Sequence, residues 1–167
     1  STGTTYSDFP SSLSYINYYK GLLKKGYRLA AHMDQDNHEM TFGTANANRM
    51  VVLAKDRTRE SLVSGIKSMR VYATNDYNAK ISFTMDGFVM GSSIKAAENI
   101  TGTIQHSDAD GESLSAVQVY GGKVGGEDAA LLHSAIGNTT FPTAQANGET
   151  WYYFAIITQE DGNKIVT

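Results

Sequence analysis

The stretch Trp151-Tyr152-Tyr153-Phe154-Ala155-Ile156-Ile157-Thr158 is the clearest strand in the sequence, because it is rich in aromatic and β-branched residues. Further upstream, Ile81, Phe83 and Met85 alternate with polar neighbours, and Asp86-Gly87 follows them as a two-residue hairpin signal. Short segments of this kind, separated by turn residues, continue from about residue 78 onward. They predict an antiparallel β-sandwich over residues 78–167.

The segments between these two strands are less regular. Ile100 and Ile104 fall in one candidate strand, and Leu114, Val117 and Val119 fall in the next. The stretch Gly121–Gly126 matches neither the Walker nor the Rossmann pattern, so we interpret it as a flexible turn. Ala129–Ile136 fits either a strand or a short helix. Asp161-Gly162 predicts a last hairpin near the end of the sequence.

Residues 1–77 follow a different pattern, in which segments with the spacing of apolar residues typical of helices alternate with segments typical of strands. A helix capped by Ser11 or Ser12 and ended by Gly26 is expected, followed by a strand over Tyr27–Met33 and a polar loop. The apolar stretch Arg49–Ala54 predicts a buried strand, Thr58 predicts the start of a second helix, and Arg70–Thr74 a further short strand. The whole chain is therefore expected to be α+β, with an α/β segment over residues 1–77 and the β-sandwich over residues 78–167.

The composition excludes several classes of protein. The chain has 167 residues, of which 41% are hydrophobic and 19% charged, as is typical of a globular protein. A net charge of -3 argues against a nucleic-acid partner. No apolar run approaches the roughly 20 residues of a membrane span, so no membrane partner is expected. The absence of Cys excludes disulfides and thiolate metal sites.

Both ends of the sequence suggest that it belongs to a longer protein. Ser1–Thr5 has neither an initiator Met nor a signal peptide, and Lys164–Thr167 stops within the second arm of the last predicted hairpin. We therefore expect a processed product or a fragment. The compartment is not decided by the sequence, although a periplasmic or extracellular location is slightly favoured.

Asp36-Asn37-His38 is the most informative motif for chemistry. A carboxylate and an imidazole two residues apart, just after a predicted strand, are a common part of hydrolytic metal sites. Two ligands do not hold a catalytic metal alone, since such sites use at least three. The alternative is a polar loop in which Asp36 caps a turn and His38 is solvated. His32 and Asp34 lie in phase with the pair, although a structural histidine and a turn residue are the simpler interpretations.

Two other clusters have competing explanations. Asp108-Ala109-Asp110-Gly111-Glu112 has the alternating acidic residues and the glycine of a calcium loop, but it lacks the remaining EF-hand ligands, and a hairpin turn is the simpler interpretation. The aromatic residues of Trp151–Phe154 suit a carbohydrate-binding face, whereas strand alternation would send half of these rings into the core.

The order and spacing of several motifs resemble the C-terminal part of the polymerase and histidinol phosphatase (PHP) superfamily. The residues concerned are Asp36-x-His38 with Gly43 after it, Thr58–Leu62, Arg70–Thr74, Ile81–Ser92 and Tyr152–Gly162. The resemblance extends from about Leu13 to Thr167. The opening His-x-His of the family has no counterpart here, because His32, His38, His106 and His133 are isolated.

This resemblance implies both a fold and an activity. Residues 1–77 would be the last elements of an α/β barrel, and the β-sandwich would be appended to it. The intact protein would be a metal-dependent hydrolase of a small phosphorylated or ester substrate, with divalent ions (Zn, Mn or Fe) as cofactors. Asp36 and His38 match the last two metal ligands of the family. A missing N-terminal half would supply the other ligands, so this chain alone is not expected to be catalytically complete.

A rival hypothesis does not need catalysis. In it, the β-sandwich is a binding module that recognises a carbohydrate or a protein partner through the face near Trp151–Phe154. A third possibility is a structural spacer in a larger secreted protein. Binding of sugars, detected by the single Trp, separates the second hypothesis from the other two.

Overall fold

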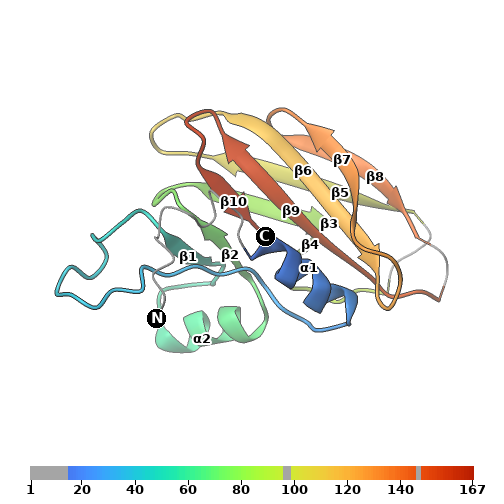
Figure 1. Cartoon of the computed structure of the whole chain (residues 1–167), viewed down its shortest axis with the longest axis horizontal. Helices are drawn as coiled ribbons and strands as arrows, with labels where there is room; N and C mark the ends of the chain where they lie inside the picture. Colours follow the sequence, from blue (N-terminus) through green and yellow to red (C-terminus); the bar gives the residue numbers. More distant parts are fainter. Residues whose placement is uncertain (1–14, 96–98, 146–147) are drawn as a thin grey trace.

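The computed structural model of the protein describes residues 15–95, 99–145 and 148–167. Within these residues two antiparallel sheets pack face to face, with strand orders β1-β2-β10-β9-β6-β7 and β4-β3-β5-β8 (Figure 1). The elements are α1 (Ile16–Lys24), β1 (Arg49–Val52), α2 (Arg59–Lys67), β2 (Val71–Thr74), β3 (Lys80–Met85), β4 (Phe88–Val89), β5 (Asn99–Ser107), β6 (Leu114–Lys123), β7 (Ala130–Ala135), β8 (Thr139–Ala144), β9 (Trp151–Gln159) and β10 (Lys164–Val166).

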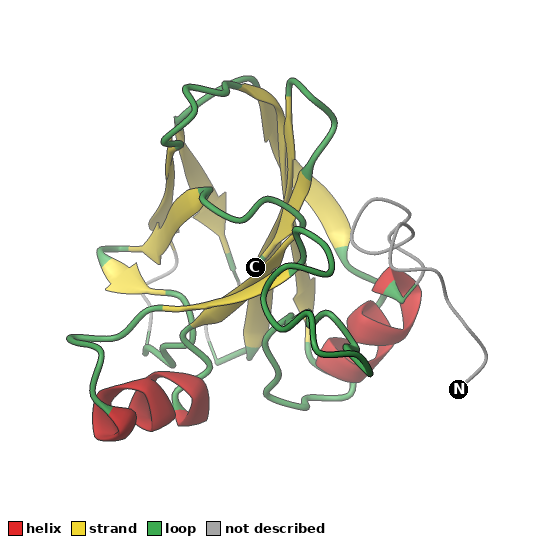
Figure 2. Cartoon of the chain, turned by 90° about the vertical axis from the view of Figure 1, so that its left-hand side faces the viewer, coloured by secondary structure: helices red, strands yellow, loops and turns green. Residues whose placement is uncertain are grey.

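The main hydrophobic core lies between the two sheets, which Figure 2 shows from the side. Every second residue of the central strands points into it, as strand geometry requires. Within the four-stranded sheet, the Phe141 ring of β8 lies over its cross-strand partner Gly102 in β5, where an added Cβ would be 2.2 Å from the ring. The buried members of this core are Tyr72, Ala79, Ile81, Phe83, Ile104, Leu114, Val117, Val119, Phe141, Ala155, Ile157 and Ile165.

The outer face of the six-stranded sheet is also covered. Helix α1 lies over β9 (Figure 1), and the Tyr19 ring meets the Phe154 ring edge-on at 5.6 Å. Beside the helix, Ala31 and Met33 form a smaller buried cluster with Ala73 and Val166. Strand β9 is therefore buried on both faces, which explains why its sequence is apolar without interruption.

The predicted α/β barrel-type segment is wrong, because the fold consists mostly of two antiparallel sheets. Tyr27–Met33 forms no strand; it is an extended segment that buries Ala31 and Met33 against the sheet. An α/β barrel needs parallel strands, but β1 and β2 are antiparallel, with Met50 opposite Ala73. An apolar stretch does not reveal whether its backbone pairs with a neighbour or only covers a sheet, and this is why the prediction failed.

The six-stranded sheet extends across the predicted domain boundary at residue 77. Strand β2 pairs with β1 on one side and with β10 on the other, where Thr74 is opposite Ile165. Strands from residues 1–77 and from residues 78–167 thus share one hydrogen-bonded sheet.

Several local predictions are confirmed. Thr58 is the N-cap of α2, and its side chain accepts a hydrogen bond from the Ser61 N–H at 3.3 Å. Gly26 ends α1 with φ +86°, a conformation that favours glycine. The predicted caps Ser11 and Ser12 lie outside the described residues. Among the described residues, neither helix has the length and apolar character needed to cross a membrane.

The hairpin predictions have mixed outcomes. Asp86 and Gly87 both have positive φ, 47° and 79°, as a tight two-residue hairpin requires. The ambiguous segment after Ala129 is a strand, β7, and not a helix. The predicted flexible turn Gly121–Gly126 is wrong in its first half, because Gly121 and Gly122 belong to β6 and pair with β9.

Candidate functional site

Asp36 and His38 lie side by side on the loop between α1 and β1. Asp36 Oδ1 is 3.2 Å from His38 Nε2, and both side chains are more than half exposed. Asp36 has a positive φ of 44°, and its N–H donates to Asp34 Oδ1 at 2.9 Å. The local turn therefore brings together the two side chains that the sequence singled out, and Asp34 acts as a turn residue.

Gln35 and Arg49 hold this loop in shape. Gln35 Oε1 accepts from the Gly43 N–H at 2.9 Å, and its Nε2 donates to the Asn46 carbonyl. From the other side, Arg49 Nη2 donates to the Gly43 carbonyl at 2.9 Å and Nη1 to the Asn48 carbonyl at 2.7 Å. The loop extends away from the sheets (Figure 1), so it presents Asp36 and His38 to the solvent on a hydrogen-bonded support.

The separation of the two donor atoms fits a shared metal ion. Bonds of about 2.0–2.2 Å at a tetrahedral angle place neighbouring ligand atoms roughly 3.3 Å apart, close to the 3.2 Å between Asp36 Oδ1 and His38 Nε2. Among the described residues, no group of three His, Asp or Glu donors within 4.8 Å includes either residue. His32 is exposed and does not complete such a group. Asp36 and His38 are thus two adjacent candidate ligands, at a distance that an Asp–His ion pair also has.

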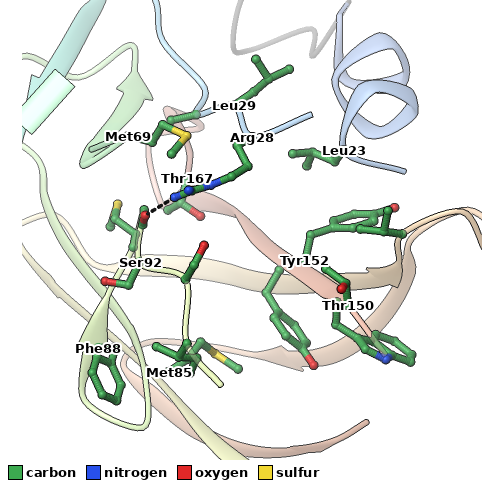
Figure 3. A pocket seen from close by; sticks show the side chains of 18 of the residues that line it. Leu23, Arg28, Leu29, Met69, Met85, Phe88, Ser92, Thr150, Tyr152 and Thr167 are labelled. Carbon is green, nitrogen blue, oxygen red and sulfur yellow. Dashed lines mark hydrogen bonds between the residues drawn. The ribbon is translucent and has the colours of Figure 1, made fainter. Parts of the chain in front are cut away.

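A cavity of about 400 Å³ opens where β9 begins. Its walls come from α1, the segment after it, the β3–β4 hairpin and β9, and they include Leu23, Met85, Phe88 and Tyr152 (Figure 3). Arg28 reaches across the cavity, and its Nη2 donates to the Gly91 carbonyl at 3.3 Å. The cavity is thus lined by apolar side chains and by nearly as much polar surface, with one guanidinium group at its margin.

The aromatic wall of this cavity is fixed by polar contacts. The Trp151 and Tyr153 rings stack with centroids 6.5 Å apart and an interplanar angle of 17°. Trp151 Nε1 donates to Glu149 Oε2 at 2.9 Å, and Glu149 also pairs with Lys123. Hydrogen bonds from Lys123 and from Trp151 lower the pKa of Glu149. The indole is therefore held in place at the cavity, by a carboxylate that stays charged.

A group of acidic residues gathers at the opposite end of β9. Asp76, Asp108 and Glu112 each offer one carboxylate oxygen, and these oxygens all lie within 4.8 Å of one another. The sequence indicated Asp108 and Glu112 through the acidic loop but missed Asp76, which comes from the loop after β2. No local sequence pattern predicts that Asp76 lies close to Asp108 and Glu112, because their proximity depends on how β2 and β5 are placed in the two sheets.

The other histidines have structural surroundings. His133 Nε2 is 2.8 Å from Thr139 Oγ1, and its ring stacks on Phe141 with centroids 4.9 Å apart. Burial lowers the pKa of His106, whose backbone N–H donates to Asn138 Oδ1 at 2.7 Å. Neither residue lies in a three-donor group among the described residues.

No family model, curated protein or solved structure matches this chain. The relationship to the PHP superfamily therefore stays a prediction that rests on the order and spacing of motifs. The roles of Asp36 and His38 rest on that prediction and on their geometry.

Proposed function

We propose that this chain is the sandwich-bearing part of a metal-dependent phosphoester hydrolase, and that Asp36 and His38 are two ligands of its divalent metal site. The observation that carries the proposal is the approach of Asp36 Oδ1 to His38 Nε2, at 3.2 Å, on an exposed and internally hydrogen-bonded loop. A divalent ion in such a site activates water for hydrolysis of an ester.

In this proposal the loop has a defined part in the chemistry. Asp36 supplies an anionic oxygen and His38 a neutral imidazole nitrogen, the two ligand types that Zn, Mn and Fe share in hydrolases. The exposure of both side chains leaves room for further ligands from another part of the longer protein to approach. The hydrogen bonds of Gln35 and Arg49 hold the loop in shape, and they limit how far it must rearrange when the further ligands join Asp36 and His38 around the metal.

Paramagnetic broadening by Mn²⁺ tests this site in the chain itself. We expect the ring resonances of His38 to broaden at lower Mn²⁺ than those of His133, whose Nε2 lies against Thr139. Asp36→Ala should abolish the difference, while Asp34→Asn, which keeps the oxygen that accepts from the Asp36 N–H, should retain it. Equal broadening of His38 and His133, or no effect of Asp36→Ala, would contradict metal ligation by the pair.

Enzyme assays test the reaction. We expect no metal-dependent hydrolysis of p-nitrophenyl phosphate by this chain alone, and a metal-dependent rate from the longer protein that contains it. In that longer protein Asp36→Asn and His38→Ala should each remove most of the rate. A full rate in both variants would remove the pair from the active site.

The cavity supports a second candidate function, the binding of a carbohydrate. Carbohydrate rings stack on aromatic faces, and the fixed Trp151–Tyr153 pair offers one beside a cavity of about 400 Å³. Arg28 and the backbone around Gly91 supply polar groups at its margin.

Fluorescence of Trp151, the single Trp of the chain, tests this candidate. Oligosaccharide titration should shift the emission in a saturable way, and Phe88→Ala at the cavity should weaken the effect. Tyr18→Ala, at an exposed position of α1, serves as the control. An unchanged emission over a set of neutral and acidic oligosaccharides would reject carbohydrate binding at this cavity.

A further inference from the structure

Two loops that connect the sheets, β2–β3 and β5–β6, meet at the end of the sandwich where β9 finishes. Asp76 follows β2, Asp108 follows β5 and Glu112 precedes β6. One carboxylate oxygen from each lies within 4.8 Å of the others. Two oxygens on opposite sides of a calcium ion, each bonded at about 2.4 Å, are at most roughly 4.8 Å apart. The three groups are therefore close enough to share one such ion.

Hydrogen bonds aim two of these carboxylates at each other. Asp76 Oδ1 accepts from the N–H groups of Asn78 and Ala79, at 2.8 and 3.3 Å. Asp108 Oδ1 accepts from the Asp110 N–H at 2.7 Å. In both residues the Oδ2 atom is turned toward Gln159, the last residue of β9. Each aspartate thus has one oxygen tied to its own loop and the other directed to a common point.

Gln159 is an independent indication of a ligand at this point. Its side chain is completely buried, and Nε2 donates to Asp76 Oδ2 at 3.1 Å and to Asp108 Oδ2 at 3.2 Å. Its buried Oε1 has no hydrogen-bond partner among the described residues. A buried carbonyl oxygen without a partner destabilises the folded chain. Rotating the amide by about 180° exchanges its nitrogen and oxygen, so that Oε1 would face both carboxylates.

That rotated position is favourable only if a cation lies between the oxygens. None of the ion pairs in the described ranges involves Asp76, Asp108 or Glu112. The cluster therefore concentrates negative charge that its own hydrogen bonds compensate only in part.

We propose that Asp76, Asp108, Glu112 and the Oε1 atom of Gln159 form a calcium site. All four ligand atoms are hard oxygens, from two loops and the end of β9. Such a set suits the flexible coordination of Ca²⁺ and offers no nitrogen or sulfur for a zinc-type ion. The ion joins the ends of β2, β6 and β9 to the end of β5, and so it ties the two sheets together at this end.

This site is separate from the proposed hydrolytic site. It contains neither Asp36 nor His38, and it serves stability and not catalysis. A ligand that binds only the folded chain raises its stability in proportion to the logarithm of ligand concentration. Calcium should therefore raise the melting temperature of the whole chain.

Calorimetric titration and thermal unfolding of the complete chain test the proposal, after treatment with EDTA. We expect one Ca²⁺ per chain and a melting temperature that rises with Ca²⁺, with a smaller effect of Mg²⁺ at the same concentration. Asp76→Asn and Glu112→Gln should each weaken binding at least tenfold. Glu112 is only half-buried, so Glu112→Gln is the variant expected to keep the fold, as circular dichroism can verify.

Asp86→Asn is the matched control. Asp86 also accepts a backbone hydrogen bond, from the Thr101 N–H at 2.7 Å, but it belongs to the β3–β4 turn. The substitution Asp86→Asn removes the same charge as Asp76→Asn or Glu112→Gln does, and it should leave calcium binding unchanged. The proposal is overturned if millimolar Ca²⁺ gives neither binding heat nor a shift in melting temperature. It is equally overturned if Glu112→Gln binds Ca²⁺ as tightly as Asp86→Asn does.

Discussion

The Tyr72 hydroxyl joins two strands of different sheets, and Tyr72→Phe removes it without changing the shape of the core. The side chain is 1% exposed. Its hydroxyl donates to the Ala79 carbonyl at 2.9 Å and accepts from the Ile81 N–H at 3.2 Å. Both backbone groups belong to the segment that carries the chain from β2 past Asp76 into β3. This one hydroxyl therefore fixes the path of the chain from one sheet to the other.

The expected loss of stability follows from these two bonds. Phenylalanine fills the same volume, so no cavity is formed and the hydrophobic contribution of the ring is kept. What is lost is one hydrogen bond from each of two buried backbone groups. Leaving a buried polar group without a partner costs about 1–3 kcal/mol. Because the segment can relax in part, we expect Tyr72→Phe to lower the free energy of unfolding by about 2–4 kcal/mol.

Urea unfolding followed by circular dichroism measures this loss. The control is Tyr77→Phe, which removes a hydroxyl that donates to Asp110 Oδ2 at 3.1 Å from a side chain that is 63% exposed. That change should cost less than about 0.5 kcal/mol. If Tyr72→Phe costs no more than Tyr77→Phe, the backbone groups of Ala79 and Ile81 find other partners, and the reasoning about the crossing is refuted.

Three further predictions concern the core, a helix cap and pH. Phe141→Ala should lower the free energy of unfolding by about 3–5 kcal/mol, since it empties the inter-sheet space above β5, and a loss under 1 kcal/mol in urea unfolding would show that the core refills it. Thr58→Ala should cost about 1 kcal/mol and Thr58→Ser much less, because serine keeps the N-cap oxygen; equal losses would contradict the capping role. Burial and the charges of Asp161 and Asp108 raise the pKa of Glu112 to about 7. In metal-free buffer the folded chain therefore binds more protons than the unfolded chain between about pH 4.5 and 7. The contribution of this group to stability therefore falls as pH rises through that range, and Glu112→Gln should flatten the melting-temperature profile there; a profile identical to that of the unaltered chain would contradict the raised pKa.

The sequence predicts features that depend on neighbouring residues. The Asp86-Gly87 hairpin, the Thr58 cap and the strand at Trp151 are confirmed because turn chemistry, capping and strand propensity act within a few residues. The side-by-side placement of Asp36 and His38 is of the same kind, since the two residues share one turn.

Features that depend on distant residues could not be predicted in this way. Tyr27–Met33 has the composition of a strand, yet the six-stranded sheet is completed by other segments and Tyr27–Met33 lies over its face. Asp76 and Gln159 are 83 positions apart in the sequence, and their hydrogen bond exists only because β2 and β9 lie one strand apart in the same sheet. No local sequence pattern around Asp76 or Gln159 predicts that the two side chains form a hydrogen bond.

Because β10 lies between β2 and β9, the six-stranded sheet can be completed only after β10 has been synthesised. Strands β1 and β2 are made early, but they join the large sheet only through β10, where Ala73 is opposite Val166. Until β10 has left the ribosome, the early strands have an unpaired edge, which is a site for aggregation. Long-range closure of this kind slows folding. A ribosome-bound chain that lacks β10 should therefore depend on chaperones more than the released chain does.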